Sequence, residues 1–174
     1  NPLVLKMREL AKPIVVAVNG VAAGAGANLA LAGDIILASE SASFIQAFSK
    51  IGLIPDTGGT LTLPRLVGPA KALAWMMLGD KISAEEAERA GMIYKVYPAE
   101  ALMDEAQKLA EMLAKSPTQA FALTKKAVNA STYAGLKAQL ELERALQNEA
   151  GATADFKEGV AAFLEKRCPQ FTGK

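Results

Sequence analysis

A stretch of small residues, Ala22 to Ala27, follows an apolar run at 14–18 and opens a segment with helical character. The backbone N–H groups at the start of a helix have no partner inside it, and the helix dipole favours negative charge there. Glycine and alanine let another group approach these N–H groups closely. The stretch is therefore a candidate site for an anion or a developing oxyanion, although small residues equally allow a helix to pack closely on a sheet.

A second candidate is Asp56, within the segment Leu53-Ile-Pro-Asp-Thr-Gly-Gly59. The run Pro-Asp-Thr-Gly-Gly strongly favours a turn. Asp56 or Thr57 could simply cap a helix that runs from residue 58 to residue 66. The functional alternative is a carboxylate at the mouth of an apolar pocket, where the loss of solvent would make it a workable base or acid.

The sequence contains no histidine and a single cysteine, Cys168. The first count excludes Ser-His-Asp and Cys-His catalysis, and the two together leave too few ligands for most catalytic zinc sites. Acid–base chemistry therefore falls to Asp, Glu, Lys, Tyr or Cys168. One cysteine also excludes a disulfide framework within the chain and fits a reducing compartment.

The elements that must position these residues alternate in type up to about residue 97 and are helical beyond it. Apolar runs predict strands at 14–18, 35–38 and 92–97. Helices are predicted at 2–11, 23–32, 58–66, 68–78, 84–90, 100–115, 117–130, 135–150 and 155–166. Ser83 to Glu86 is a capping box, and Gly33 suits a left-handed helix end.

This order predicts an α/β fold in two regions, residues 1–98 and 99–174. A chain of 174 residues with 51% hydrophobic content can form one domain with a helical appendage. The net charge of +1 is not the basic excess that is typical of nucleic-acid-binding proteins, and no apolar run is long enough to span a bilayer. Several helices with apolar faces beyond an α/β core suggest a surface that packs against another subunit.

Four segments, in this order, resemble the crotonase superfamily of enoyl-CoA hydratases and isomerases. They are Asn19-Gly-Val-Ala-Ala-Gly-Ala-Gly-Ala-Asn-Leu-Ala-Leu-Ala-Gly-Asp34, Phe44-x-x-x-Phe-x-x-Ile-Gly-Leu-Ile-Pro-Asp-Thr-Gly-Gly59, residues 83–96, and Gly159-Val-Ala-Ala-Phe-Leu-Glu-Lys-Arg167. The resemblance covers essentially all 174 residues. It implies a crotonase-like ββα spiral core over residues 1–98 and a C-terminal helical trimerisation region over residues 99–174.

The chain begins at Asn1-Pro2, without methionine, and family members begin well upstream. We therefore expect a fragment of the family fold. The part that precedes Asn1 in the family contains the first strands, most of the CoA-binding surface and one of two N–H donors of the oxyanion hole.

The resemblance also implies a catalytic arrangement. The oxyanion-hole N–H falls at Ala25, and the two glutamates of hydratases fall at Asn28 and Phe48, neither of which can titrate. Asp56 falls where isomerases of ring 1,2-epoxyphenylacetyl-CoA and related dehalogenases carry an aspartate. The residues expected to contact the substrate are Gly24, Gly26, Asn28, Phe48, Ile54, Pro55 and Gly58.

The implied substrate is an acyl-CoA thioester, with CoA contacts at Phe163 and Lys166 that usually come from a neighbouring subunit. A core aromatic and a solvated lysine are equally good interpretations of these two positions. The resemblance implies a homotrimer or a dimer of trimers, with no metal and no cofactor except the coenzyme A of the substrate. Neither nucleic acid nor a membrane is expected as a partner, and the expected location is cytoplasmic.

The expected activity is isomerisation in phenylacetate degradation. Ala25 N–H would hold the thioester enolate while Asp56 moves a proton, which yields an oxepin or a shifted double bond. Three alternatives remain open. Asp56 could attack an aryl carbon in a dehalogenase or hydrolase, Asn28 could position water in a weak hydratase, or the chain could be a non-catalytic acyl-CoA-binding subunit.

Overall fold

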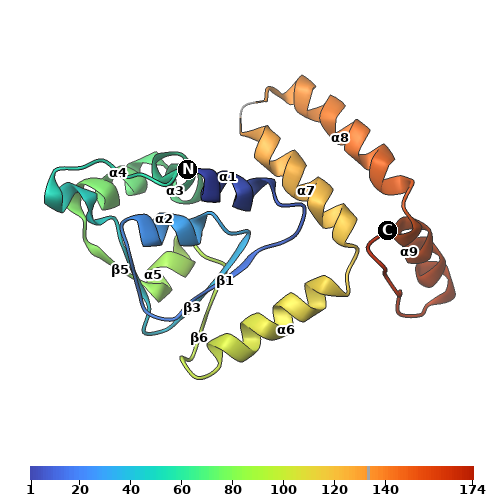
Figure 1. Cartoon of the computed structure of the whole chain (residues 1–174), viewed down its shortest axis with the longest axis horizontal. Helices are drawn as coiled ribbons and strands as arrows, with labels where there is room; N and C mark the ends of the chain where they lie inside the picture. Colours follow the sequence, from blue (N-terminus) through green and yellow to red (C-terminus); the bar gives the residue numbers. More distant parts are fainter. Residues whose placement is uncertain (133) are drawn as a thin grey trace. The chain divides into compact units, whose positions relative to one another are not determined.

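A computed structural model describes residues 1–132 and 134–174 and confirms the α/β class. The chain divides into two compact units. Unit 1 comprises Asn1–Met7 and Ile14–Lys108, and unit 2 comprises Arg8–Pro13 and Leu109–Lys174. All strands of the described residues lie in unit 1 (Figure 1).

The first sheet of unit 1 is parallel and has the order β1-β3-β6. Its strands are β1 (Val15–Val18), β3 (Ile35–Ser39) and β6 (Lys95–Tyr97). Strands covered on both faces are continuously apolar, which explains why the runs at 14–18 and 35–38 are correct predictions. The third strand is shorter than predicted, because Met92 N–H bonds to Ala87 O in the turn that follows a helix.

The second sheet consists of three strands, none of which was predicted from the sequence. It has the order β2-β4-β5, with β2 (Val21–Ala23) parallel to β4 (Ser43–Ile45) and β4 antiparallel to β5 (Lys81–Ser83). Residues 19–22 were expected to form a turn, with a helix beginning at residue 23, two residues before the observed start of α2 (Ala25–Leu31). Residues Val21–Ala23 instead pair with β4, because a partner distant in sequence supplies the hydrogen bonds.

The helix after this strand, α2 (Ala25–Leu31), ends differently from the prediction. Its C-terminal cap is Ala32, and Gly33 is absent from the residues with positive φ, so the left-handed cap predicted at Gly33 is wrong. A Cβ atom on Gly33 would lie 2.4 Å from Val16 Cγ2. Glycine is therefore required here for the close approach of the helix end to β1.

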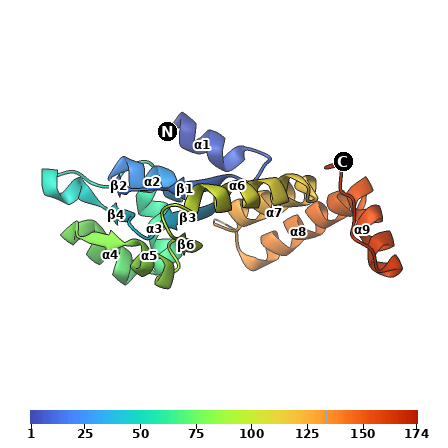
Figure 2. The same cartoon turned by 90° about the horizontal axis from the view of Figure 1, so that it is seen from below.

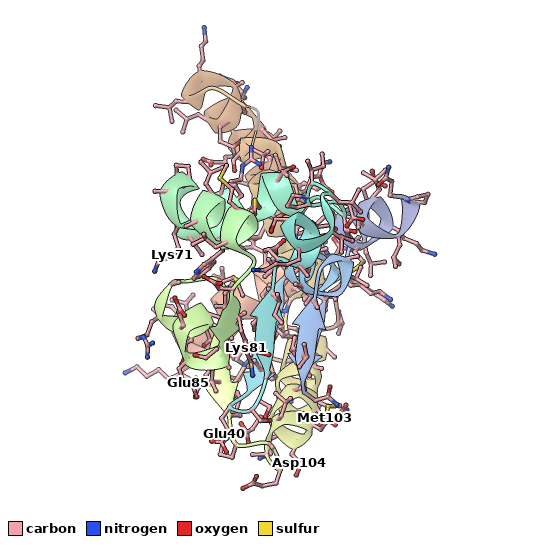
Figure 3. All side chains as sticks on the ribbon, turned by 90° about the vertical axis from the view of Figure 1, so that its left-hand side faces the viewer. Glu40, Lys71, Lys81, Glu85, Met103 and Asp104 are labelled. Atoms are coloured by element: carbon pink, nitrogen blue, oxygen red, sulfur yellow. The ribbon has the colours of Figure 1, made fainter. Side chains whose placement is uncertain are left out.

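Unit 1 contains further helices besides α2. They are α1 (Pro2–Glu9), which continues into unit 2, the 3-10 helix η1 (Ala47–Ile51), α3 (Gly59–Val67), α4 (Pro69–Leu78) and α5 (Ala84–Arg89). Ser83 Oγ accepts a hydrogen bond from Glu86 N–H at 3.1 Å, which confirms the predicted cap of α5. Figure 3 shows Lys71 of α4 and Glu85 of α5 pointing outward. Helices α2 and α3 are in contact, and so are α4 and η1.

Unit 2 is helical. Helix α6 (Leu102–Ala114) crosses from unit 1, and α7 (Thr118–Ser131), α8 (Leu136–Gly151) and α9 (Ala154–Glu165) follow, each within two residues of its predicted bounds. Helices α7 and α8 run side by side in both views (Figure 1, Figure 2). Thr153 caps α9 through its Oγ1, which accepts from Phe156 N–H at 3.0 Å. In the described part of the chain, no helix has the length and apolar character needed to cross a membrane.

Candidate active site

The small-residue turn joins β2 to α2. Gly24 adopts a positive φ of 53°, and its N–H donates to Ile45 O of β4 at 2.8 Å. Ala25 is the first residue of α2, and within the described residues no acceptor takes its N–H. The turn therefore leaves the Ala25 N–H at the start of a helix open to a ligand oxygen, and the oxyanion role of this N–H stays a prediction.

Phe48 supports this turn. The side chain of Phe48 is buried, and a Cβ atom on Gly24 would lie 3.6 Å from its ring. Phe48 thus packs against the backbone of Gly24, a role that its prediction as a substrate contact did not include. The aromatic ring fixes the turn that carries the Ala25 N–H.

Asn28 lies about one helical turn after Ala25 and is 2% exposed. Its Oδ1 accepts from Gln46 Nε2 at 2.8 Å, and its Nδ2 donates to Asp56 O at 2.9 Å. The side-chain amide therefore joins α2, the residue before η1 and the turn before α3. Gln46 did not emerge from the sequence, because nothing in its neighbours distinguishes it from an ordinary polar residue.

Asp56 occupies a tight turn. Its carbonyl oxygen accepts from Gly59 N–H at 2.9 Å in addition to Asn28 Nδ2, and its carboxylate Oδ1 accepts from Thr57 Oγ1 at 2.7 Å. Thr57 and Gly58 both have positive φ, 56° and 81°. A β-branched residue rarely adopts this conformation, which costs on the order of 1–3 kcal/mol.

Two sequence interpretations of Asp56 are corrected by this geometry. Helix α3 begins after Gly58 without a side-chain capping bond, so neither Asp56 nor Thr57 caps it. The expected loss of solvent is also absent, since the Asp56 side chain is exposed in this structure. Apolar surface nonetheless lies beside it in the chain, because Ile54 is 80% exposed and Leu53 is also exposed, with Pro55 half-buried.

The two residues expected to contact CoA lie in unit 2. Phe163, on α9, is 83% exposed, which contradicts its interpretation as a core aromatic in this chain. Lys166 is exposed and forms the left-handed C-terminal cap of α9 with φ 55°. Both side chains are available to a ligand, and they lie in a different unit from Ala25 and Asp56.

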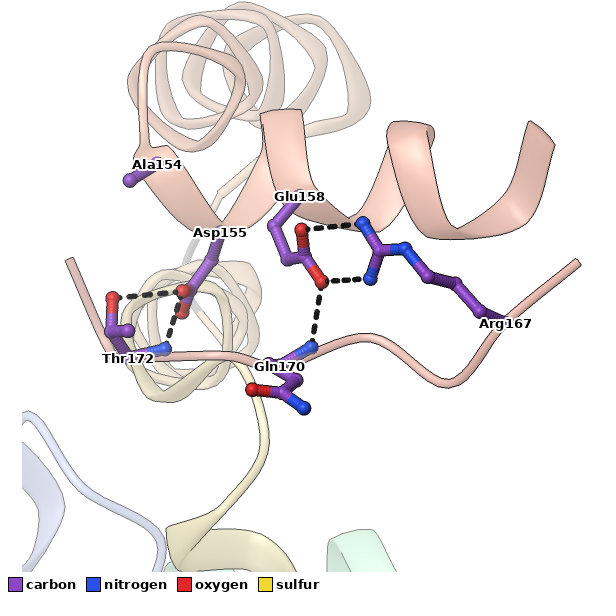
Figure 4. A pocket seen from close by; sticks show the side chains of 6 residues that line it. All are labelled: Ala154, Asp155, Glu158, Arg167, Gln170 and Thr172. Carbon is purple, nitrogen blue, oxygen red and sulfur yellow. Dashed lines mark hydrogen bonds and ion pairs between the residues drawn. The ribbon is translucent and has the colours of Figure 1, made fainter. Parts of the chain in front are cut away.

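A cavity of about 270 Å³ lies in unit 2 between α9 and the C-terminal segment (Figure 4). The buried carboxylate of Asp155 accepts from the N–H groups of Thr172 and Gly173, at 2.7 and 2.9 Å. Glu158 binds Arg167 through two contacts, of 2.6 and 2.9 Å, and accepts from Gln170 N–H at 2.8 Å. These carboxylates fasten the C-terminal segment, residues 170–174, to α9 within unit 2.

The Glu158 contacts predict a pH dependence of this attachment. The bond from Arg167, followed by that from Gln170 N–H, lowers the pKa of Glu158 from 4.5 to about 2. A carboxyl group whose pKa is lower in the folded state stabilises the fold above pH 4.5, and this contribution disappears as the pH falls toward 2. In denaturant unfolding between pH 6 and pH 2, Glu158→Gln should therefore be destabilising at pH 6 and nearly neutral at pH 2.

The matched control is Glu149→Gln, at an exposed glutamate on α8. Its difference from wild type should not change over the same pH range. An equal destabilisation by Glu158→Gln at pH 6 and pH 2 would contradict the prediction, because the Gln side chain would then act through packing alone.

The chain matches the family model described as enoyl-CoA hydratase/isomerase over residues 1–174. It is 55% identical over 174 residues to a 1,2-epoxyphenylacetyl-CoA isomerase of Escherichia coli (strain K12), covering 100% of this chain and 66% of the relative. It is 51% identical over 174 residues to a protein of Rhodobacter capsulatus that is named a probable enoyl-CoA hydratase, covering 100% of this chain and 68% of the relative.

A crystal structure of an enoyl-CoA hydratase/isomerase from Cupriavidus metallidurans CH34 superposes with a TM-score of 0.93 at 39% identity, covering 98% of this chain and 64% of that one. The chain thus spans about two thirds of the length of the relatives that it matches. Sequence motifs, the family model and the backbone agree on one assignment. The chain belongs to the enoyl-CoA hydratase/isomerase family, and it has the crotonase fold over the part of the family's length that it covers.

Proposed function

We propose that this protein is an acyl-CoA isomerase in which Ala25 N–H holds the thioester oxygen and Asp56 moves a proton. The substrate that we propose is ring 1,2-epoxyphenylacetyl-CoA, an intermediate of phenylacetate degradation, or an enoyl-CoA whose double bond shifts. The first is the substrate that gives the Escherichia coli relative its name.

The observation that carries this proposal is the bond from Asn28 Nδ2 to Asp56 O, at 2.9 Å. Asn28 belongs to the same helix as Ala25, so this bond attaches the turn that carries the Asp56 carboxylate to the helix of the N–H donor. A donor for a developing oxyanion and a nearby carboxylate are the two groups that proton transfer next to a thioester requires.

The proposed reaction begins when the thioester oxygen accepts from Ala25 N–H. The Asp56 carboxylate takes a proton from the carbon next to the thioester carbonyl, and the electron pair of that bond is delocalised onto the oxygen as an enolate. Returning the proton at a different carbon shifts the double bond. With a ring epoxide, the C–C bond shared by the epoxide and the six-membered ring breaks while both C–O bonds remain. The product is the seven-membered oxepin, and no atoms are gained or lost.

Hydration, the activity in the name of the Rhodobacter relative, has less support. The two hydratase glutamate positions hold Asn28 and Phe48, and neither side chain can take up a proton from water. The Asn28 amide is also engaged at both ends by Gln46 and Asp56, so it is not free to position a water molecule. This argues against the weak hydratase that the sequence left open.

The proposal extends to assembly and to CoA. An exposed apolar stripe on α9 consists of Phe156, Val160, Phe163 and Leu164, at the spacing of one helix face. Such an exposed stripe would be buried by another subunit, which supports a homotrimer or a dimer of trimers. In this assembly Phe163 and Lys166 contact the CoA of a neighbouring subunit. We further propose a cytoplasmic protein without a metal or any cofactor except substrate CoA.

The proposal predicts which thioesters the complete protein converts. Ring 1,2-epoxyphenylacetyl-CoA or a 3-enoyl-CoA should be isomerised about 100-fold faster than crotonyl-CoA is hydrated, because the paired acid–base groups of hydration are missing. Rates are measured by absorbance and by chromatography of the thioesters. Faster hydration of crotonyl-CoA would instead indicate a hydratase, and binding without turnover would indicate a non-catalytic subunit.

A further inference from the structure

The amide pair of Asn28 and Gln46 connects three segments beneath the Asp56 turn. We propose that this pair is a positioning device: it holds the Asp56 turn in its working conformation and acts through Asp56, without touching the substrate. This inference rests on the proposed role of Asp56 in proton transfer, and it replaces the expectation that Asn28 contacts the substrate.

The direction of the hydrogen bonds follows from the Asp56 carbonyl, which can only accept. The Asn28 group that faces it must therefore be the NH₂, and the Asn28 oxygen must face Gln46. Gln46 in turn must present its NH₂, at 2.8 Å from Asn28 Oδ1. The chain of donors thus runs from Gln46 through Asn28 to Asp56 and has a single consistent orientation.

Both amides are buried, each with 2% of its surface exposed. The space around Asn28 is also closed on the side of α3, because a Cβ atom on Gly59 would lie 2.2 Å from Asn28 Nδ2. A side chain confined in this way cannot rotate toward a ligand without losing both bonds. Its remaining role is to hold the groups that it already contacts.

The segment that it holds needs an external restraint. Thr57 and Gly58 are consecutive left-handed residues, and the threonine is strained by its positive φ. Two bonds close this turn at the Asp56 carbonyl, one from Gly59 within the turn and one from Asn28 outside it. Only the second connects the turn to the helix of Ala25, so its loss should let the Asp56 carboxylate move relative to the N–H donor.

The sharpest single change is Asn28→Asp, which keeps the shape and the bond from Gln46 but places an oxygen against the Asp56 carbonyl. Gln46→Met removes the donor to Asn28 at similar volume, and no other side-chain bond is lost within the described residues because Gln46 Oε1 has no partner there. The control is Asn148→Asp at an exposed position of α8. Two readouts are needed: steady-state kinetics with the thioester that wild type isomerises, and amide hydrogen exchange at Gly59.

We expect Asn28→Asp to lower kcat by about 10- to 100-fold with KM within about twofold of wild type, because misplacing a reacting group by about 1 Å has an effect of this size. Gln46→Met should lower kcat in the same direction by less. Exchange at Gly59 N–H should accelerate in both variants, while Asn148→Asp changes neither readout. A purely structural role would lower the folded fraction but leave kcat per folded molecule unchanged.

The inference is overturned if Asn28→Asp retains kcat, or if it raises KM at constant kcat, which would mean that Asn28 contacts the substrate. A wild-type protein without turnover of any thioester refutes the proposed function instead. In that case hydrogen exchange at Gly59 N–H alone tests whether Asn28 holds the Asp56 turn. Unchanged exchange in Asn28→Asp refutes this role, and faster exchange supports it.

Discussion

Replacement of Asp56 by asparagine should lower kcat about 10²- to 10⁴-fold, with a much smaller change in KM. The substitution keeps the shape of the side chain and removes only the ability to take up and release a proton. Ala25 N–H still binds the thioester oxygen, and Asn28 still bonds to the backbone carbonyl of residue 56. The loss should therefore appear in the chemical step, which single-turnover measurements with the preferred thioester can isolate.

Asp104→Asn is the matched control, since Asp104 is exposed at the start of α6 in the same unit (Figure 3). It should leave kcat and KM unchanged. Asp56→Asn should also unfold at the same denaturant concentration as wild type. The carboxylate is exposed, and the asparagine side-chain oxygen can accept the hydrogen bond from Thr57 Oγ1 in its place. Isomerisation by Asp56→Asn at a near wild-type rate would reduce Asp56 to a turn residue and refute the mechanism.

A different outcome would follow if Asp56 attacks carbon directly. With a halogenated aryl-CoA, the Asp56 carboxylate would form an ester with the aryl carbon and the halide would leave. The peptide that contains residue 56 would then gain the mass of the aryl-CoA minus that of the hydrogen halide. Proton transfer forms no such bond. Mass spectrometry of the quenched reaction therefore separates the isomerase from the dehalogenase or hydrolase that the sequence also allowed.

The helices of unit 2 and the strands β1 and β3 could be predicted from sequence because their signals are local. Helices α6 to α9 each repeat apolar residues over three or more turns, and β1 and β3 are short apolar runs with clear boundaries. The cap of α5 at Ser83 was also predictable, since its acceptor and donor lie three residues apart. In each case the information lies within the element itself.

The remaining features depend on partners that are distant in sequence. Strand β2 has only three residues, and its hydrogen bonds come from β4, twenty-two residues further along. Gly33 was interpreted as a cap because its neighbours suit one, whereas the close approach of Val16 decides its role. The importance of Gln46 lies in its hydrogen bond to Asn28, which in turn bonds to Asp56 O. The roles of Ala25 and Asp56 stay predictions made from sequence motifs. The contacts that Asn28, Phe48 and Gln46 make with the segments around these two residues could not be predicted from sequence.

Phe44→Ala should have the largest effect on stability, a loss of about 3–5 kcal/mol in the free energy of unfolding. Phe44 is 1% exposed and lies at the centre of β4, the middle strand of the second sheet. It pairs with Ala22 on one side and Ile82 on the other. Truncation removes its buried apolar surface and leaves a cavity that these paired strands cannot close, which denaturant unfolding would measure.

Tyr94→Ala is the control for loss of an aromatic ring, because Tyr94 is 67% exposed in the same unit. Its free energy of unfolding should stay within about 0.5 kcal/mol of wild type.

Phe44 also affects the turn of the candidate site, since the next residue, Ile45, accepts a hydrogen bond from Gly24 N–H at 2.8 Å. Loosening β4 should therefore accelerate exchange at Gly24 N–H more than at Tyr94 N–H, which bonds to Ile36 O in the other sheet. Equal acceleration at both positions would mean that Phe44 stabilises the unit as a whole and has no particular hold on the turn that presents Ala25.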